Sequence, residues 1–290
     1  MKKRLITAAL CFILLVSFSF SAMAAPLVLK KNMTGVAIAI KDAATVTLDG
    51  EKVRFEAEPV RIDSSVDSDI YVPMLSFCKV MGAKVLKWDE ETQSALAVFR
   101  EFAIDATAGD VYITANGRCL YAEYGCKVID GVLMVQLSTL CKALDAVYEI
   151  DMEAKTIDII SGAGIIMSGD EFYNQDDLYW LARIIWAESG NQCFEGKIAV
   201  GNVVINRAND PSYRFPDDIY SVIFQEGQFE PVSNGTVYNT PTEECWAAAK
   251  LALEGVRPVG DSLYFAAFFN CWAGNNRIFY RQIQGHYFWL

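Results

Sequence analysis

An internal repeat in the first half of the chain limits the folds that this half can adopt. The segment YVPMLSFCKVMGAKVLKWDEETQSALAV, which begins at Tyr71, is matched by MVQLSTLCKALDAVYEIDMEAKTIDI, which begins at Met134. Each copy reads as a short extended segment, an amphipathic helix, a turn and a strand of alternating apolar and polar residues. Because the same order of elements occurs twice, we expect residues 27–162 to form one α+β domain made of two related halves.

Each copy of the repeat is preceded by the signature of a β-hairpin. Residues 44–55 read ATVTLDGEKVRF and residues 111–121 read VYITANGRCLY. Asp-Gly and Asn-Gly between apolar runs favour a two-residue turn, because both turn positions need a positive φ. The hairpins predict that the N-terminal half is rich in β-structure.

The first copy of the repeat resembles a known domain family. Tyr71-Val72-Pro73, Gly82-Ala83 and Trp88-Asp89 are similar to the copper amine oxidase N-terminal-like stalk domain of secreted bacterial proteins. The second copy departs from that pattern at Gln136 and Asp145, where the family has proline and glycine. The segment contains no histidine, so the family name implies no copper here. The resemblance implies a spacer or an attachment module for an envelope or spore-coat component; a scaffold without a ligand is the alternative.

The N-terminus has the pattern of an export signal. Three basic residues precede an apolar run from Leu5 to about Phe20, and Ala22-Met23-Ala24 follows. This order predicts a secretory signal peptide over residues 1–24. An uncleaved anchor helix is the alternative, although the run is shorter than the roughly 20 residues that a span needs. We therefore expect a secreted or envelope protein.

Composition excludes several classes of function. The net charge of −11 disfavours nucleic-acid binding, which needs clustered Lys and Arg. Of eight cysteines, seven follow residue 24, so an exported protein is expected to form some disulfides, with Cys119 and Cys126 as the first expected pair. The single histidine, His286, disfavours a zinc enzyme, and HExxH, GxSxG and P-loop motifs are absent. We expect no metal and no cofactor.

The second half of the chain predicts a separate, mainly helical domain. Residues 163–175 lack periodicity and are expected to be a linker, with the second domain at 176–290. Asn174 is placed to cap a first helix, and residues 194–206 read as a second helix. Thr240-Pro241-Thr242-Glu243 has the form of a capping box with proline at the first helical position, before CWAAAKLALEG. SLYFAAFF and IFYRQIQGHYFW near the C-terminus resemble strands.

A carboxylate occupies the apolar face of the first of these helices. Leu178, Leu181, Ile184 and Ile185 mark one helical stripe, and Glu188 falls on it just before Gly190. A partly desolvated carboxyl group holds its proton near neutral pH and can donate it to a leaving oxygen. A helix-end glutamate turned to solvent, or paired with Arg183 or Lys197, is the alternative.

Several blocks of the second half resemble the bacterial cell wall hydrolase family that includes the spore cortex-lytic enzymes. They are LARIIWAESGNQCFEGKIAVGNVVINR, RFPDDIYSVIFQEGQFEPVSNGT and the terminal IQGHYFW. The resemblance implies a lysozyme-like fold and cleavage of the β-1,4 bond after muramic acid in peptidoglycan glycan strands, in vegetative wall or spore cortex. It places the catalytic glutamate at Glu188. The second acidic residue of the family is replaced here by Gln192, which removes a helper charge.

Aromatic rings and amides suited to sugar binding follow Glu188 in the sequence. The candidate substrate-binding residues are Gln228, Phe229, Tyr264, Asn270, Trp272 and His286. For each ring, packing in the core is the alternative, and His286 is equally well explained as a core histidine.

One positioned carboxylate favours a lytic transglycosylase over simple hydrolysis, which usually needs two. Glu226 and Glu230 are expected in a loop without a helical frame. A non-catalytic wall-binding or spore-structural protein is a further alternative. A peptidase or amidase that uses Cys193, Cys245 or Cys271 with His286 is the least favoured.

Overall fold

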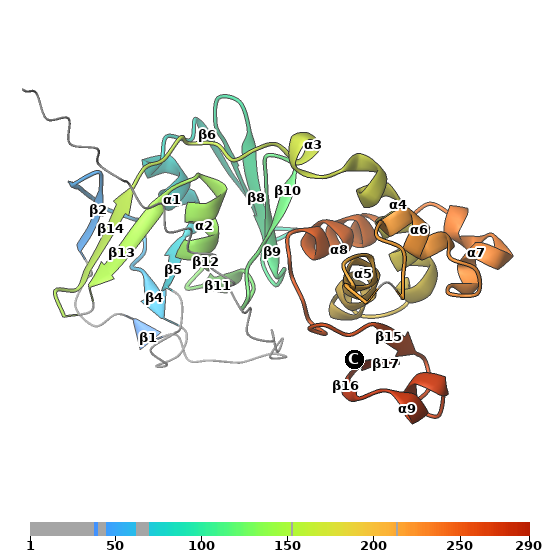
Figure 1. Ribbon diagram of the computed structural model, residues 1–290. Coiled ribbons are helices and arrows are strands. Elements are labelled where there is room, and N and C mark those ends of the chain that lie inside the picture. Colours follow the sequence, from blue (N-terminus) through green and yellow to red (C-terminus); the bar gives the residue numbers. More distant parts are fainter. Residues whose placement is uncertain (1–37, 40–44, 62–69, 152, 213) are drawn as a thin grey trace, which may run out of the picture.

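The computed structural model describes residues 38–39, 45–61, 70–151, 153–212 and 214–290. A β-rich N-terminal domain and a helical C-terminal domain lie side by side (Figure 1). The expected signal peptide lies outside the described residues. Within the described ranges, no helix is long and apolar enough to cross a membrane.

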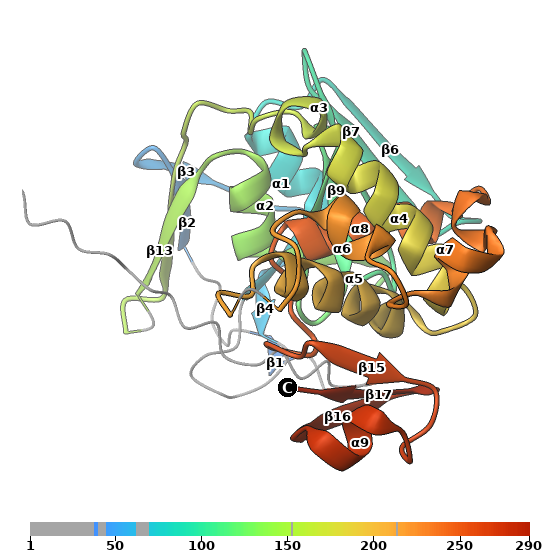
Figure 2. The same ribbon diagram turned by 45° about the vertical axis from the view of Figure 1, so that its right-hand side comes forward.

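Three sheets and two short helices make up the described part of the N-terminal domain (Figures 1 and 2). The sheets have the strand orders β1-β4-β5-β12-β11, β10-β9-β8-β7-β6 and β13-β14-β2-β3. The elements are β1 (Ile38–Ala39), β2 (Thr45–Leu48), β3 (Glu51–Val53), β4 (Val60–Arg61), β5 (Ile70–Pro73), α1 (Met74–Val80), β6 (Val85–Asp89), β7 (Ser94–Val98), β8 (Ala103–Thr107), β9 (Tyr112–Ala115), β10 (Arg118–Tyr121), β11 (Lys127–Ile129), β12 (Val132–Gln136), α2 (Leu137–Ala143), β13 (Val147–Asp151) and β14 (Thr156–Ile160).

The internal repeat is present in the structure as a pair of equivalent units. Strand β5 leads into α1, and β12 leads into α2. The equivalent residues Val72 and Val135 face each other across the antiparallel pair of β5 and β12, so a local two-fold axis relates the halves. Cys78 and Cys141 occupy equivalent buried positions on the two helices. The order that the repeat predicts, a strand followed by a helix, thus occurs in both units.

Both predicted hairpins are also confirmed. Asp49 and Gly50 join β2 to β3 with φ values of 51° and 82°, and Asn116 and Gly117 join β9 to β10 with φ values of 49° and 80°. Two successive positive φ angles match the strand twist of a tight hairpin, which explains the Asp-Gly and Asn-Gly pairs.

The expected disulfide between Cys119 and Cys126 is wrong. The seven cysteines of the described part are free thiols. Cys119 on β10 is buried in the core of the C-terminal domain, whereas Cys126 is buried in the core of the N-terminal domain. The two side chains therefore belong to different cores, a difference that their spacing in the sequence does not reveal.

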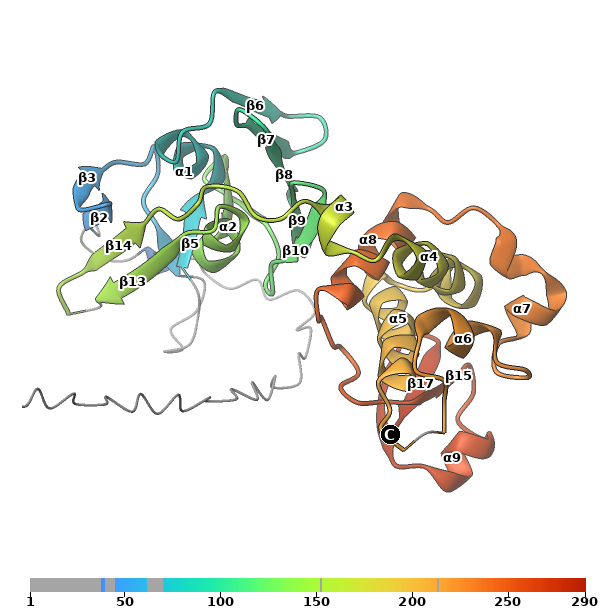
Figure 3. The same cartoon turned by 45° about the horizontal axis from the view of Figure 1, so that its top comes forward.

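The C-terminal domain consists of three longer helices, several short ones and a small three-stranded sheet. The elements are α3 (Gly169–Phe172), α4 (Gln175–Ser189), α5 (Phe194–Ala208), α6 (Ile219–Phe224), α7 (Glu230–Asn234), the 3₁₀ helix η1 (Thr236–Tyr238), α8 (Glu243–Leu253), β15 (Tyr264–Ala266), α9 (Trp272–Asn276), β16 (Phe279–Ile283) and β17 (His286–Trp289). The sheet order is β15-β17-β16, and Ile283 and Phe288 pack against α5. Figure 3 shows α9 at the end of this domain that is remote from the N-terminal sheets.

The helix starts follow local capping. The Asn174 side chain accepts hydrogen bonds from the N–H groups of Asp176 and Asp177, as predicted for α4. The predicted start of α8 is wrong, because Thr242 rather than Thr240 is its N-cap and accepts from Cys245 N–H. Thr242 has the same kind of side-chain oxygen two residues later, and it is followed directly by two acidic residues in the first turn, which stabilise a helix start.

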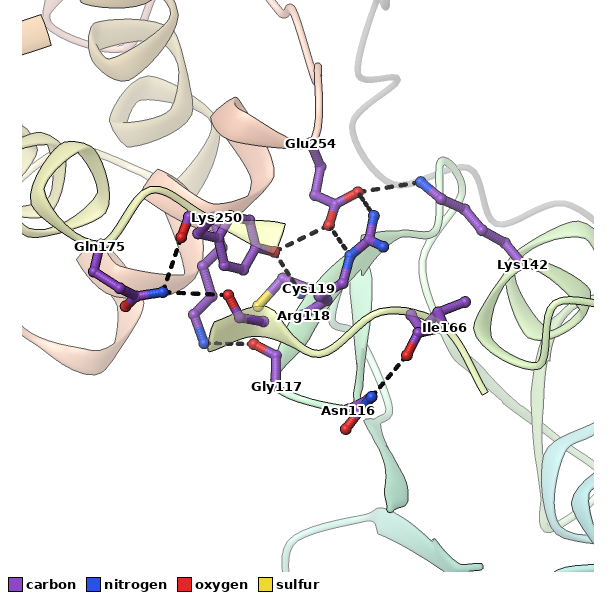
Figure 4. A network of polar contacts seen from close by, with 11 residues as sticks. Asn116, Gly117, Arg118, Cys119, Lys142, Ile166, Gln175, Lys250 and Glu254 are labelled. Carbon is purple, nitrogen blue, oxygen red and sulfur yellow. Dashed lines mark hydrogen bonds and ion pairs between the residues drawn. The ribbon is translucent and has the colours of Figure 1, made fainter. Parts of the chain in front are cut away.

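A buried ion pair joins the two domains. Arg118 on β10 donates to both carboxylate oxygens of Glu254 at 2.7 and 2.8 Å (Figure 4). The Tyr173 hydroxyl donates to the same carboxylate at 3.0 Å, and Lys142 adds a contact of 3.3 Å. Lys250 Nζ donates to the carbonyl oxygen of Gly117 at 2.8 Å. Charged bonds at the C-terminal end of α8 therefore form part of the interface.

Residues 163–175, expected as a linker, are held closely against the N-terminal domain. They contain α3, and the N–H of Gly169 donates to the carbonyl oxygen of Asn116 at 2.8 Å. A Cβ at Gly169 would lie 2.5 Å from the carbonyl oxygen of Gly117, so only glycine allows this approach. Cys119 and Tyr173 are both buried in the core of the C-terminal domain. The hairpin β9–β10 thus contributes side chains to the second domain.

Candidate active site

Glu188 lies in the last turn of α4, on the face that packs into the core. Ile184 and Ile185, one turn before it, are fully buried. The carboxyl group is half-buried, and no hydrogen bond or ion pair joins it to another side chain of the described ranges. Glu188 is therefore a carboxylate at the edge of an apolar face without a fixed partner.

The surroundings of Glu188 favour its protonated form. Burial, followed by the negative charge of Glu230, raises the pKa of Glu188 to about 7, although the positive charge of Arg207 acts in the opposite direction. A carboxyl group with such a pKa is protonated in a large fraction of molecules near neutral pH. It can serve both as an acid and, after losing its proton, as a base.

Arg207, near the end of α5, is the buried cation of this site. Its Nε donates to the carbonyl oxygen of Leu263 at 2.8 Å, and its guanidinium lies 4.9, 5.2 and 5.8 Å from the ring centres of Phe215, Phe229 and Tyr264. Its Nη1 is buried without a hydrogen-bond partner in the described part of the chain. Burial lowers the pKa of Arg207 to about 10, and Tyr264 and Glu188 partly offset this effect.

The position of Arg207 in the sequence also indicates that it is buried. Arg207 follows Val203 by four residues and Val204 by three, and both valines are fully buried. It therefore lies on the apolar stripe of α5, as Glu188 does on α4. A charged residue on each of two packed apolar stripes predicts a buried polar site between the helices.

The expectation that Glu230 lies in a loop without a helical frame is wrong. Glu230 is the first residue of α7, and Pro231 follows it inside the helix. Proline is favoured in the first turn because its missing N–H is not needed there. Glu226 does lie in the preceding turn. Glu230 is thus fixed by secondary structure, and its charge reaches Glu188.

Two of the predicted substrate-binding residues contact Arg207, and a third lies beside one of them. Phe229 is buried beside Arg207. Tyr264 on β15 contacts Arg207 and lies 5.5 Å from the ring of Trp272, which is 58% exposed. The structure therefore places Phe229 and Tyr264 against Arg207, and Trp272 next to Tyr264.

The other predicted residues have different surroundings. Gln228 and Asn270 are exposed on loops. His286 on β17 is buried against Phe265 and Phe288, and burial lowers its pKa. Its Nδ1 has no hydrogen-bond partner among the described residues. Among the described residues, His286 makes ring contacts with Phe265 and Phe288 and no hydrogen bond to a cysteine thiol, so the Cys/His alternative has no geometric support.

Gln192, where the resemblance expects an acid, has a structural contact. Its Oε1 accepts a hydrogen bond of 2.9 Å from the N–H of Gly285, in the turn between β16 and β17. The carbonyl oxygen of Gln192 accepts from Lys197 at 2.8 Å. Gln192 therefore connects the start of α5 to the C-terminal sheet.

Comparisons with known proteins agree with this division of the chain. Residues 191–289 match the Cell Wall Hydrolase family, and residues 47–159 match the copper amine oxidase N-terminal domain. Glu188 lies three residues before the first of these matched ranges.

Curated relatives are similar over part of the chain. The spore cortex-lytic enzymes of Halalkalibacterium halodurans and Bacillus cereus are each 34% identical over 93 residues, which cover 32% of this chain and 28% and 35% of theirs. The cell wall hydrolase CwlJ of Bacillus subtilis is 32% identical over 93 residues, covering 31% of this chain and 66% of CwlJ. The chain thus spans about a third of the length of the spore cortex-lytic relatives.

Among solved structures, the catalytic domain of the germination-specific lytic transglycosylase SleB from Bacillus anthracis is 29% identical. The match covers 43% of this chain and 100% of that domain, with a TM-score of 0.38.

Proposed function

We propose that this protein is a secreted peptidoglycan-cleaving enzyme, on the premise that residues 191–289 form a Cell Wall Hydrolase domain and residues 47–159 a copper amine oxidase N-terminal domain. It cleaves the β-1,4 bond between N-acetylmuramic acid and N-acetylglucosamine as a lytic transglycosylase, on a lysozyme-like domain. Glu188 is its catalytic residue. The observation that carries the proposal is a carboxyl group of pKa about 7 beside a buried arginine and a group of aromatic rings.

The reaction needs one group that first gives and then takes a proton. Protonated Glu188 donates to the glycosidic oxygen, and the bond from that oxygen to the muramoyl C1 breaks. The Glu188 carboxylate then accepts the proton of the muramoyl 6-hydroxyl, whose oxygen bonds to C1 and closes a 1,6-anhydro ring. Glu188 ends protonated as it began, and no water is consumed.

Simple hydrolysis of the same bond is the second candidate, and the position of Glu230 favours it. A second carboxylate that is fixed on α7 and reaches Glu188 electrostatically is suited to activate a water molecule. Intramolecular attack by the 6-hydroxyl has the advantage of an effective molarity that reaches roughly 10⁵ M in well-oriented systems. We therefore favour the anhydro product.

The relatives suggest the setting of the reaction. Spore cortex-lytic enzymes and a germination-specific lytic transglycosylase are among the similar proteins, so we propose that the substrate is spore cortex peptidoglycan and that the protein acts in the spore or cell envelope. Substrate-binding roles fall to Phe229, Tyr264 and Trp272, with Gln228 and Asn270 at the exposed edge. His286 then supports the sheet from its buried side. The N-terminal domain serves as the contact to an envelope or spore-coat component.

Product analysis tests the proposal. Purified cortex and vegetative peptidoglycan are each incubated with the full chain, and the released muropeptides are measured by mass spectrometry before and after borohydride reduction. The expected products carry anhydromuramic ends, lighter by one water than hydrolysis products and inert to reduction. Reducible muramic ends as the main product would instead establish hydrolysis, and no release from either substrate would refute a peptidoglycan-cleaving activity.

A further inference from the structure

The C-terminal sheet and α9 form an arginine–aromatic platform, made of Tyr264, Trp272 and Arg277. The Arg277 guanidinium lies 4.9 Å from the ring centre of Tyr264 and 4.7 Å from that of Trp272. Its Nη2 donates to the Tyr264 hydroxyl at 3.3 Å, and its Nη1 donates to the carbonyl oxygen of Asn276 at 3.1 Å. Both rings and the cation are therefore held in one arrangement before any ligand binds.

The platform is continuous with the candidate active site. Tyr264 contacts Arg207 on one side and Trp272 on the other, and Arg207 acts electrostatically on Glu188. Other apolar side chains of the same C-terminal segment are also exposed. They are, with their exposed fractions, Phe268 (64%), Phe269 (43%), Ile278 (72%) and Phe279 (43%). A ligand that extends from Glu188 past Tyr264 would reach Trp272 next.

The charge of the platform is unusual for this acidic chain. Residues 262–290 contain no Asp or Glu, although the whole chain has 36. The two arginines of this segment differ, because Arg281 pairs with Glu195 at 3.0 Å, whereas no carboxylate of the described residues pairs with Arg277. The Nε of Arg277 is buried and has no hydrogen-bond partner in the described part. The platform therefore combines the exposed ring of Trp272 with one cation that has no counter-ion among the described residues.

We propose that the arginine–aromatic platform is a distal glycan subsite, which stacks a sugar ring on Trp272 and attracts, through Arg277, a free carboxylate of the stem peptide that a muramoyl residue carries. The proposal rests on the proposed function, and it adds a determinant of substrate choice. A neutral glycan gains only the stacking on Trp272, whereas a carboxylated glycan gains both contacts. Discrimination between the two depends on Arg277.

Binding measurements on full-length Glu188→Gln protein test the subsite without turnover. The probes are soluble peptidoglycan strands and neutral N-acetylglucosamine oligomers, and the variants are Trp272→Ala, Arg277→Gln and Arg277→Lys. Tyr238→Ala is the matched control, because Tyr238 is 59% exposed and lies on η1, outside the platform. Thermal unfolding of each variant verifies that it is folded.

The expected results separate the two contacts. Trp272→Ala weakens binding of both glycans by about tenfold or more, as loss of an aromatic anchor does. Arg277→Gln weakens binding of the carboxylated strands only, and Arg277→Lys restores part of it. Equal affinities for Trp272→Ala and the Tyr238→Ala control overturn the subsite. So does a variant that keeps glycan affinity but loses binding to phosphatidylglycerol vesicles, which would make the surface a lipid contact.

Failure of the subsite is distinguishable from failure of the proposed function. If the wild-type chain releases muropeptides while Trp272→Ala binds them normally, only the subsite is wrong. If the wild-type chain releases none, the proposed function is wrong, whatever the platform binds.

Discussion

Two glutamates at the ends of helices differ in what surrounds their carboxyl groups. Glu254 follows α8, and burial by itself would raise its pKa, but bonds from Arg118, Lys142 and Tyr173 lower the pKa below its ordinary value. Glu188 lies in the last turn of α4 without a bonded partner among the described residues, and its pKa rises to about 7. Burial acts in the same direction on both groups, so their partners decide the outcome.

The difference assigns each carboxylate a role. A buried charge with three bonds is stable only in its ionised form, and removing one partner leaves another charge unpaired. Such a group holds structure together. A buried carboxyl group without a bond is free to change its protonation state, which is the requirement for proton transfer. Glu254 therefore joins the domains, whereas Glu188 is left available for chemistry.

The largest expected effect is on activity, from Glu188→Gln. An amide cannot donate or accept the proton of the reaction, so we expect release of muropeptides to fall about 10²- to 10⁴-fold. The free energy of unfolding should change little or rise at neutral pH, because a desolvated carboxylate is removed. Rates of muropeptide release and urea unfolding at pH 7 measure both quantities. An active Glu188→Gln enzyme would eliminate the assignment.

The next largest effect is on stability, from Glu254→Gln. The change removes the counter-charge of Arg118, whose own side chain is only 10% exposed. Because a buried charge is then left unpaired, the free energy of unfolding should fall by about 3 kcal/mol. Lys142→Gln is the matched control, because Lys142 contacts the same carboxylate from a side chain that is 53% exposed and should contribute less than about 1 kcal/mol. Equal losses in the two variants, measured by urea unfolding, would contradict the buried-pair interpretation.

The sequence predicted the elements of this molecule better than their association. The repeat and the two hairpins depend on local periodicity and turn chemistry. Val72 and Val135 are equivalent positions of the repeat in the sequence, and they pair in the structure. The destination of Cys119 depends instead on which domain lies against β10. Residues 163–175 have a composition typical of a linker, and only the close approach of Gly169 to Gly117 explains why the segment is held. Long-range contacts of this kind leave no periodic signal.

The candidate site was predictable in part for the same reason. Glu188 was found because a carboxylate on an apolar stripe breaks a local pattern. Arg207 breaks the same pattern on α5, but its importance depends on the packing of α5 against α4. Arg277 has no pattern at all, because its position between Tyr264 and Trp272 is set by the turn of the chain through α9.

The pH dependence of stability should have opposite signs at the two glutamates. The pKa of Glu188 is higher in the folded protein than in the unfolded chain. Its contribution to the free energy of unfolding is therefore fully present below the unfolded value near 4.5 and is lost as the pH rises through about 7. Above pH 7, Glu188→Gln should therefore exceed wild type in stability, by on the order of 2 kcal/mol, and below pH 4.5 the gain should vanish. The pKa of Glu254 is lower in the folded protein than in the unfolded chain. Its contribution to the free energy of unfolding is therefore present above the unfolded pKa and is lost as the pH falls through the folded pKa. Urea midpoints from pH 4 to 8 measure both trends, and a stability gain of Glu188→Gln that is independent of pH would count against the raised pKa.

The smallest expected effect tests whether Glu230 acts on Glu188 by charge alone. The negative charge of Glu230 raises the pKa of Glu188, so Glu230→Gln should lower it and move the alkaline limb of the activity profile to lower pH by less than about one unit, with activity retained at acidic pH. Glu226→Gln, in the exposed turn before α7, is the control and should leave the profile unchanged. Loss of activity at every pH in Glu230→Gln would give Glu230 a chemical role, because a second carboxylate that activates water is required throughout the pH range. The products of the wild-type reaction should then carry reducible ends, so the pH profile and the product analysis must agree on one mechanism.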